Sequence, residues 1–282
     1  MRRVNKKIRP VVAYLGPAGT YTEQAMINYF VDSVPKYQTC GTLLDIFRAV
    51  TSNKALYGVV PLENSTDGSV NATLDLLYRE DLKICGEVEE EVRHCLIVRP
   101  KTTLQSVKVV ISHPQALAQC RDFLVKHFPH AKTMEADSTA SAVRITARAK
   151  DAAAIGSERA ARTSRLKIAL DNIADNPNNF TRFAVIAKND AVPTGNDKTS
   201  TVFAMKNVAG ALHKALEPFA KRRINLTKIE SRPTRDKPWE YIFFMDFEGH
   251  HSDRLCNEAL EEMKKFCQLF KLLGSYPKAN KL

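Results

Sequence analysis

The chain has 282 residues, of which 44% are hydrophobic and 26% charged, a composition typical of a globular protein with room for one large domain and a smaller one. No apolar run approaches the roughly 20 residues that span a bilayer, and the N-terminus lacks a signal-peptide pattern, so we expect a cytoplasmic protein that binds no membrane. The net charge of +11 is spread over helix faces and a basic N-terminal tail, which argues against nucleic acid and favours small anionic substrates.

The first third of the chain alternates short apolar runs with amphipathic segments, the pattern of strands joined by helical crossovers. The predicted elements are strands at 11–16 and 55–62 and helices that begin near Thr20, Thr42 and Val70. Thr20 with Glu23 has the spacing of a capping box, and Thr42 with Asp45 opens the second helix in a similar way. This part of the chain is therefore α/β.

The same alternation starts again between Cys95 and about Ile173. The predicted elements are strands at 95–98, 107–112 and 152–156 and helices at 115–128, 139–150 and 157–162. The later apolar run at 184–186 is a candidate for a strand that returns to the first unit. We therefore predict two α/β lobes that flank a cleft.

A polar stretch with Pro and Gly at 188–198 marks a domain boundary, so we assign 9–190 to the large region and 199–282 to a smaller domain. The smaller domain reads as strands at 200–206, 224–231, 239–247 and 271–276 and helices at 210–222 and 252–270. This βαββαβ order is the ferredoxin-like arrangement. In the last helix, helical spacing predicts a buried stripe of Leu255, Ala259, Met263, Phe266 and Phe270.

Three loops place polar side chains directly after apolar strands, and a fourth leads into a strand, positions from which α/β folds commonly present groups to a ligand. They contain Thr20 in GPAGTYTE, Glu63, Asn64 and Ser65 in PLENSTDGS, Ser112 and Gln119 in SHPQALAQC, and Thr181, Arg182 and Phe183 in NNFTRF. Each loop alone is also compatible with an ordinary turn, a helix cap or a salt-bridged Arg beside a core Phe. Ser112 can cap the helix at Pro114. We reject a hydrolase pair with His113, because adjacent side chains point apart and no G-x-S-x-G motif is present.

In the smaller domain, Gly210 precedes a helix whose N–H groups could meet a carboxylate, and Pro233 ends a strand. Trp239 and Tyr241 are predicted to be core or interface aromatics. The six cysteines are scattered, with no C-x-x-C pair and no His at metal-ligand spacing. Reduced structural thiols are therefore expected, rather than zinc ligands or disulfides.

Taken together and in order, these segments resemble prephenate dehydratase with a C-terminal ACT regulatory domain. The resemblance covers residues 11–277 and includes GALHKAL and INLTKIESRPT in the smaller domain. It implies a catalytic region of two lobes like a type II periplasmic binding protein, with the active site in the cleft. It also implies decarboxylative dehydration of prephenate to phenylpyruvate, carbon dioxide and water in L-phenylalanine biosynthesis, without a metal or organic cofactor.

The resemblance further implies roles for individual residues. The catalytic set is Thr181, Glu63, Asn64, Ser112 and Gln119, and the substrate contacts are Thr20, Ser65, Arg182 and Phe183. The Thr181 hydroxyl is expected to assist the departing oxygen, with Glu63 or a water as a second proton source because Thr is a weak acid. Arg182 either anchors a substrate carboxylate or has a structural role, and strand alternation, which points it away from Thr181, favours the structural role.

The ACT region is expected to bind L-phenylalanine at a subunit interface for feedback regulation, in a homodimer or homotetramer. The implied effector site is Gly210, Ala211, Leu212, His213, Asn225, Leu226, Glu230, Ser231, Arg232 and Pro233. The chain departs from its relatives at Ser164, Arg165 and Ala174, which bears on the hinge or on substrate selectivity. Two alternatives remain open: arogenate dehydratase, and a small-molecule sensor without turnover.

Overall fold

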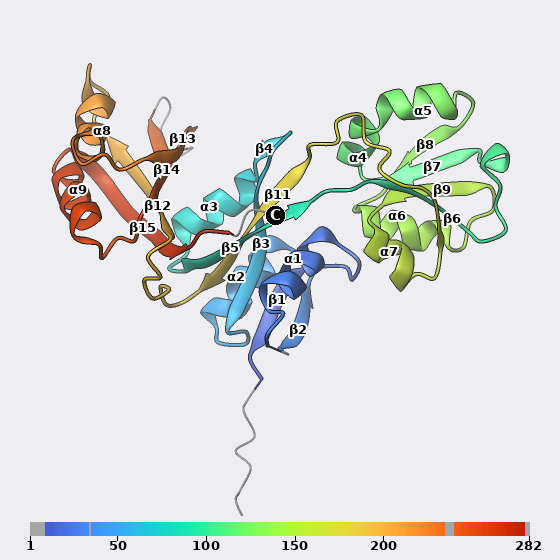
Figure 1. Ribbon diagram of the computed structural model, residues 1–282, viewed down its shortest axis with the longest axis horizontal. Coiled ribbons are helices and arrows are strands. Elements are labelled where there is room, and N and C mark those ends of the chain that lie inside the picture. The colour runs from blue at the N-terminus through green and yellow to red at the C-terminus, as the bar shows by residue number, and fades with distance from the viewer. Residues whose placement is uncertain (1–8, 34, 235–239, 280–282) are drawn as a thin grey trace, which may run out of the picture.

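The computed structural model describes residues 9–33, 35–234 and 240–279, and Figure 1 shows three bodies in a row. The first lobe is in the centre, the second lobe on the right and the C-terminal domain on the left. The chain passes from the first lobe to the second and returns along a neighbouring path. The predictions for Trp239 and for the basic residues before Arg9 lie outside the described ranges.

The first lobe is a six-stranded mixed sheet with the order β2-β1-β3-β11-β5, and β4 pairs with β3. Its strands are β1 (Val11–Leu15), β2 (Lys36–Cys40), β3 (Tyr57–Asn64), β4 (Gly68–Ser69), β5 (Lys83–Glu91) and β11 (Phe180–Ala187), and its helices are α1 (Tyr21–Tyr29), α2 (Leu43–Thr51) and α3 (Asn71–Arg79). Strand β11 lies between β3 and β5 and is antiparallel to both. The predicted return of the chain to the first unit is therefore confirmed.

Of the two capping boxes predicted in this lobe, the one at α2 is formed and the one at α1 is incomplete. At α2 the capping box is complete, because the Thr42 and Asp45 side chains each accept from the other residue's backbone N–H. At α1 the Thr20 side chain accepts from the Glu23 N–H, but the Glu23 carboxylate accepts from Gly19 N at 2.8 Å. The Glu23 carboxylate does not complete the capping box with the Thr20 N–H. It pairs instead with Arg159 of the second lobe, as described below.

The second lobe is a five-stranded sheet with the order β10-β6-β9-β7-β8. Its strands are β6 (Cys95–Val98), β7 (Val109–Ser112), β8 (Lys132–Glu135), β9 (Ala152–Gly156) and β10 (Lys167–Leu170), and its helices are α4 (Pro114–Gln119), α5 (Arg121–His127), α6 (Thr139–Thr146), α7 (Glu158–Thr163) and a 3₁₀ turn (Leu104–Ser106). The helix predicted at 115–128 is broken at Cys120. The Asp175 carboxylate accepts from the N–H groups of Asp122 and Phe123 and so caps a new helix there.

The C-terminal domain has the predicted βαββαβ order and an antiparallel sheet, β13-β14-β12-β15. Its elements are β12 (Asp197–Met205), α8 (Ala211–Lys221), β13 (Leu226–Pro233), β14 (Tyr241–Glu248), α9 (Arg254–Lys264) and β15 (Cys267–Pro277). The stripe predicted for the last helix is confirmed at Ala259 and Met263, which are fully buried, and is wrong at its other members. Leu255 and Phe266 are 45% and 43% exposed and Phe270 lies in β15, because the chain leaves the helix to pair with β12 from Cys267 onward.

Helices α8 and α9 cover one face of this sheet, and the other face packs on the first lobe (Figure 1). Phe244 and Tyr276 of the C-terminal domain belong to the same hydrophobic cluster as Leu82 and Ile84 of the first lobe. At Gly274, with φ of 145°, an added Cβ would lie 2.1 Å from the Ile84 carbonyl oxygen, so only glycine fits there. The predicted α/β fold with two lobes and a ferredoxin-like domain is confirmed.

Candidate active site

A cavity of about 410 Å³ lies between the two lobes. Five of the nine residues predicted for catalysis and substrate binding line it: Thr20, Asn64, Gln119, Thr181 and Phe183. They come from α1, β3, α4 and β11, so the cleft is assembled from segments far apart in the sequence. Within the described ranges, no group of three or more His, Cys, Asp or Glu side chains is arranged to hold a metal ion.

The Thr181 hydroxyl is oriented by Asn64, its partner across the β3–β11 ladder. Asn64 Oδ1 accepts from the backbone N–H groups of Thr66 and Asp67 at 3.0 and 3.1 Å, and these groups can only donate. The Asn64 amino group must therefore face Thr181, and Nδ2 lies 2.9 Å from Oγ1. Because the Thr181 oxygen accepts this bond, its own proton can be donated to another group.

The same amino group begins a chain of amides that crosses the cleft. Asn64 Nδ2 donates to Asn179 Oδ1 at 2.7 Å, and Asn179 Nδ2 donates to Gln119 Oε1 at 2.9 Å. Gln119 Nε2 in turn donates to the Asp67 carboxylate at 2.7 Å. Asp67 and Asn179 were not predicted as site residues, because in the sequence they have the form of ordinary turn formers.

Contacts on the far side of the cleft also join the lobes. Arg159 of α7 lies 2.6 Å from the Glu23 carboxylate of α1, and Ser157 Oγ donates to the Gly19 carbonyl at 2.9 Å. Burial alone would raise the pKa of Glu23, but the bonds from Arg159 and Gly19 N outweigh it and lower the pKa. The lobes are therefore held together at both rims of the cleft.

The partial positive charge at the cleft comes from helix ends, and Asp137 adds a carboxylate to the same lining. Among the described residues that line the cleft, none is Lys or Arg. Instead the helices α1, α2, α3 and α6 begin there, at Thr20, Leu43, Val70 and Ser138. Helix α3 has no side-chain cap. Helix N-termini carry partial positive charge and unpaired N–H groups, so this arrangement suits an anionic ligand.

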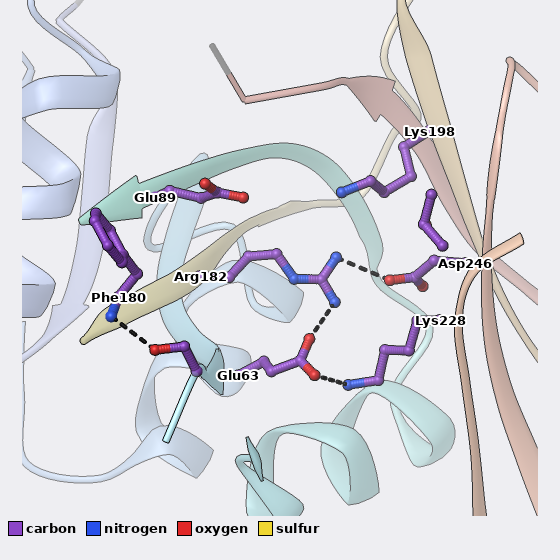
Figure 2. Close-up of a pocket in the computed structure, with 9 residues that line it drawn as sticks. Glu63, Glu89, Phe180, Arg182, Lys198, Lys228 and Asp246 are labelled. Atoms are coloured by element: carbon purple, nitrogen blue, oxygen red, sulfur yellow. Dashed lines mark hydrogen bonds and ion pairs between the residues drawn. The ribbon is translucent and has the colours of Figure 1, made fainter. Parts of the chain in front are cut away.

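Glu63 and Arg182 lie on the opposite side of the same strands, toward the C-terminal domain (Figure 2). The Arg182 guanidinium pairs with Glu63 at 2.9 Å, Asp246 at 2.8 Å and Glu87 at 3.3 Å. Burial alone would lower the pKa of Arg182, but these carboxylates raise it well above its usual value. Strand alternation points both side chains away from the cleft, so the structure does not place Glu63, the second candidate for the proton source, or Arg182 among the residues that line it. For Arg182 this agrees with the structural role that alternation favoured.

Ser65 and Ser112 are also absent from the described lining of the cleft. Ser65 Oγ bonds to the Asn178 carbonyl and the Phe180 N–H, which fixes the turn before β11. Ser112 is fully buried and donates to the Ile155 carbonyl at 2.8 Å. The cap of α4 is His113, not Ser112 as predicted. Ser112 therefore cannot pair with His113 as a nucleophile, in agreement with the sequence interpretation.

The predicted effector residues fall on two faces of the C-terminal domain. Ala211 and Leu212 line a cavity of about 330 Å³ beside Phe243, and Ser231 lies opposite Phe243 in the β13–β14 ladder. Gly210, at the N-cap of α8, has φ of 80°, a conformation that favours glycine. His213, Asn225 and Pro233 are exposed, and Leu226 packs against the domain core.

Glu230 and Arg232 lie on the other face of β13 and contact the first lobe. Glu230 accepts from Ser69 Oγ at 2.5 Å, and Arg232 pairs with Asp75 at 2.8 Å and donates to the Asn71 carbonyl at 3.0 Å. The structure therefore does not place Glu230 and Arg232, which were predicted for the effector site, among the residues that line this cavity. Alternation along β13 leaves Ser231, but not its neighbours, on the side of the cavity.

Comparisons with known proteins agree with this architecture. Residues 12–191 match the family described as prephenate dehydratase, and residues 199–264 match the ACT domain. The chain is 48% identical to the bifunctional chorismate mutase/prephenate dehydratase of Aquifex aeolicus, over 98% of this chain and 75% of that protein.

Two solved structures are similar over most of their length. The prephenate dehydratase of Arthrobacter aurescens in complex with L-Phe has a TM-score of 0.86 at 33% identity, over 95% of this chain and 90% of that one. GqqA, described as a novel type of quorum quenching acylase, has a TM-score of 0.85 at 29% identity, over 95% and 98% of the two chains.

Proposed function

This chain belongs to the prephenate dehydratase family and carries an ACT domain, and we propose that Thr181 donates the hydrogen bond that lets the hydroxyl of prephenate leave as water. The reaction breaks the bond to the ring carboxylate and the bond to the ring hydroxyl together. The dianion takes up one proton and gives the phenylpyruvate anion, carbon dioxide and water. Because an aromatic ring forms, the driving force lies in the substrate, and the protein must orient it and assist the leaving group.

The orientation of Asn64 is the observation that carries this proposal. Its amino group donates to Thr181 Oγ1 at 2.9 Å, which directs the Thr181 proton away from the protein amide. Thr is too weak an acid to remain ionised. The hydroxyl therefore donates its proton to the leaving oxygen and takes up another proton from water. Asn64 then stabilises negative charge that develops on the threonine oxygen during the transfer.

The carboxylates of prephenate are held by helix N-termini. The starts of α1, α2, α3 and α6 face the cleft, and the described lining residues include no Lys or Arg. The apolar side chains of Leu15, Leu43 and Phe183 line the same cavity and give the ring a dry wall. A dianion bound by peptide dipoles needs no cationic side chain as its partner.

The test compares Thr181→Ser with Thr181→Val in a prephenate assay that follows phenylpyruvate by its ultraviolet absorbance in alkali. Thr181→Ser keeps the hydroxyl and retains turnover. Thr181→Val keeps the shape and lowers kcat by about 10²–10⁴-fold, the usual contribution of a positioned proton donor. A Val variant with near-normal kcat would refute the role of Thr181. No product from the wild-type protein would support the sensor alternative.

Asp137 bears on the choice between prephenate and arogenate. Arogenate carries an ammonium group where prephenate has a keto group, and Asp137 is the carboxylate found among the described lining residues. Relative kcat/KM for the two substrates, in the wild type and in Asp137→Asn, measures the preference. A higher kcat/KM for arogenate that falls selectively in Asp137→Asn would reverse the assignment.

L-Phenylalanine binds the ACT domain and inhibits the reaction. Its carboxylate meets the start of α8 at Gly210, and its side chain enters the cavity beside Phe243. Strand β13 is at the edge of the described sheet, and Ile229 on it is 45% exposed. An unpaired edge with an exposed apolar residue is a surface for a second copy, so this edge forms the dimer.

Strand β13 connects the effector to the cleft. Ser231 lies opposite Phe243, which lines the effector cavity, while Glu230 and Arg232 on either side of it bind Ser69 and Asp75 of the first lobe. Ser69 precedes α3 and Asp75 lies one turn into it, and Val70 at the start of this helix lines the cleft. A ligand that shifts β13 therefore shifts a helix end that binds the substrate.

Two variants separate binding of the effector from its transmission. Ser231→Leu places a larger side chain next to Phe243 at the cavity and raises the L-phenylalanine concentration for half inhibition by about tenfold or more, with weaker binding of L-phenylalanine by calorimetry. Arg232→Leu keeps binding but weakens inhibition, because the contact with α3 is lost. Unchanged inhibition in both variants would place the effector site elsewhere.

A further inference from the structure

His94 lies where the two chain segments that join the lobes run side by side. It is between β5 and β6, and its carbonyl accepts from Ile173 N of the returning segment at 2.8 Å. Two residues earlier, Val92 N donates to the Asn179 carbonyl at 2.7 Å. His94 is 3% exposed and lines the cleft. A side chain at this point can act on both lobes and on the cleft.

The hydrogen bonds around Gln119 fix the tautomer of His94. Gln119 Nε2 donates to the Asp67 carboxylate, which can only accept, so Gln119 Oε1 faces His94. His94 Nε2 lies 2.9 Å from this oxygen and must carry the proton. Burial lowers the pKa of His94, which keeps the ring neutral. Nδ1 is therefore an acceptor.

His94 Nδ1 is buried and has no hydrogen-bond partner among the described residues. A buried acceptor without a partner is unusual and opposes folding, and a Phe or Leu at this position would carry no such atom. The edge-on ring contact with Tyr21, at 6.2 Å, requires only an aromatic ring. The bond from Nε2 to Gln119 is what distinguishes histidine here.

We infer that His94 is a positioning residue for Thr181, acting through Gln119, Asn179 and Asn64. Because Gln119 Oε1 is held toward His94, Asn179 must direct its amino group to Gln119 and its carbonyl to Asn64. If Gln119 turned over, the amino groups of Asn179 and Asn64 would face each other. Asn64 is held by the backbone N–H groups of Thr66 and Asp67, so Asn179 would turn away. The Asn64 amino group would then lose the acceptor that holds it in place beside the Thr181 hydroxyl.

This inference rests on the proposed role of Thr181 and is tested by three substitutions of His94. In His94→Gln the side-chain amide places an N–H near the position of Nε2, so kcat stays within about threefold of wild type. His94→Asn reaches only the position of Nδ1, and His94→Phe keeps the ring alone. Both lower kcat by about tenfold or more with a smaller change in KM, because orientation in the transition state is lost rather than substrate binding.

The control is His130→Phe, at an exposed histidine of the same lobe, which leaves kcat unchanged. Circular dichroism and thermal unfolding establish that each variant is folded. Nitrogen-15 NMR of the imidazole in the wild type shows a protonated Nε2 and an unprotonated Nδ1. Wild-type kcat in His94→Phe, or equal losses in His94→Gln and His94→Asn, would overturn the inference.

A cycle with Thr181→Val, which removes the hydroxyl, separates this inference from the role of Thr181. If His94 acts through the hydroxyl, the effects of His94→Phe and Thr181→Val on kcat are not additive. Additive effects would overturn the inference. A Thr181→Val variant with normal kcat would refute the proposed role of Thr181 as proton donor. The order of kcat among the three His94 variants would still decide whether the hydrogen bond from Nε2 contributes to turnover.

Discussion

The two faces of the β3–β11 strand pair differ in kind. Toward the cleft, Asn64 and Thr181 belong to a network of uncharged amides and hydroxyls with one fixed direction. Toward the ACT domain, one residue away on each strand, Glu63 and Arg182 belong to a buried cluster of charges. The amide network orients a single proton at any ordinary pH, whereas the ionic cluster holds two domains together and depends on every partner being charged.

The contrast has a physical reason. Neutral amides lose little when they are buried with their bonds made, so they can surround a cavity that must bind a dianion without competing with it. Buried charges are stable only with complete partners, and Arg182 has three carboxylates while Glu87 has Lys198 as well. A cluster of buried charges is poorly suited to a substrate whose charge changes during the reaction, but well suited to a permanent interface between domains.

The strongest way to break the contrast is Asn64→Asp. This change replaces the amino group that donates to Thr181 by a carboxylate oxygen, so the Thr181 hydroxyl donates to the new carboxylate instead of to the substrate. We expect kcat to fall by about 10²–10³-fold, with the fold retained by circular dichroism. A variant with kcat near wild type would show that the direction of the network does not matter.

On the ACT face, Arg182→Met should act on stability. It leaves Glu63, Glu87 and Asp246 without their shared cation, and breaking a buried ion cluster costs about 3–5 kcal/mol. Urea unfolding measures the change. The matched control is Arg162→Met, because Arg162 is exposed on α7 and pairs only across one helical turn, which predicts a change below about 0.5 kcal/mol. Equal effects in the two variants would contradict the structural role of Arg182.

Acid should weaken the ACT face. Burial raises the pKa of Asp246, but Arg182 and the hydroxyl of Ser200 outweigh it and lower the pKa below its usual value. A depressed folded-state pKa means that the native state binds fewer protons than the unfolded chain. The contribution of Asp246 to the free energy of unfolding is complete above the pKa of about 4 that Asp has in the unfolded chain. It is lost as the pH falls through the lower pKa of Asp246 in the folded protein.

The measurement compares wild type with Asp246→Asn in urea unfolding between about pH 6 and pH 3. The wild type should lose more of its unfolding free energy over this range than the variant, because the variant has no carboxylate to protonate at this position. Parallel losses in the two proteins would show that Asp246 does not contribute to the acid sensitivity.

The smallest effect on turnover is expected for Glu63→Gln. Glu63 adjoins Asn64 in the chain but points to the ACT face, where it pairs with Arg182 and Lys228. We expect kcat within about threefold of wild type and a loss of about 1–2 kcal/mol in the unfolding free energy, because the pair is partly exposed. A loss of kcat comparable to that of Asn64→Asp would return Glu63 to the candidates for the proton source.

The sequence alone determined the elements that depend on near neighbours. The capping box of Thr42 and Asp45, the βαββαβ order and the strands next to Asn64 and Thr181 all follow from local spacing and periodicity, although β3 and β11 extend further than predicted and include both residues. Alternation also indicated that Arg182 points away from Thr181. The resemblance of the ordered motifs to one family supplied the activity, which no single loop specified.

Only the tertiary structure decided what each polar side chain faces. Glu63, Glu230 and Arg232 resemble site residues in the sequence, yet their partners Lys228, Ser69 and Asp75 belong to another domain. The reverse holds for His94 and Asn179, whose hydrogen bonds are made with distant residues and leave no local pattern. Periodicity fixes the face of a strand on which a side chain lies, whereas its partner is set by packing between segments far apart in the chain.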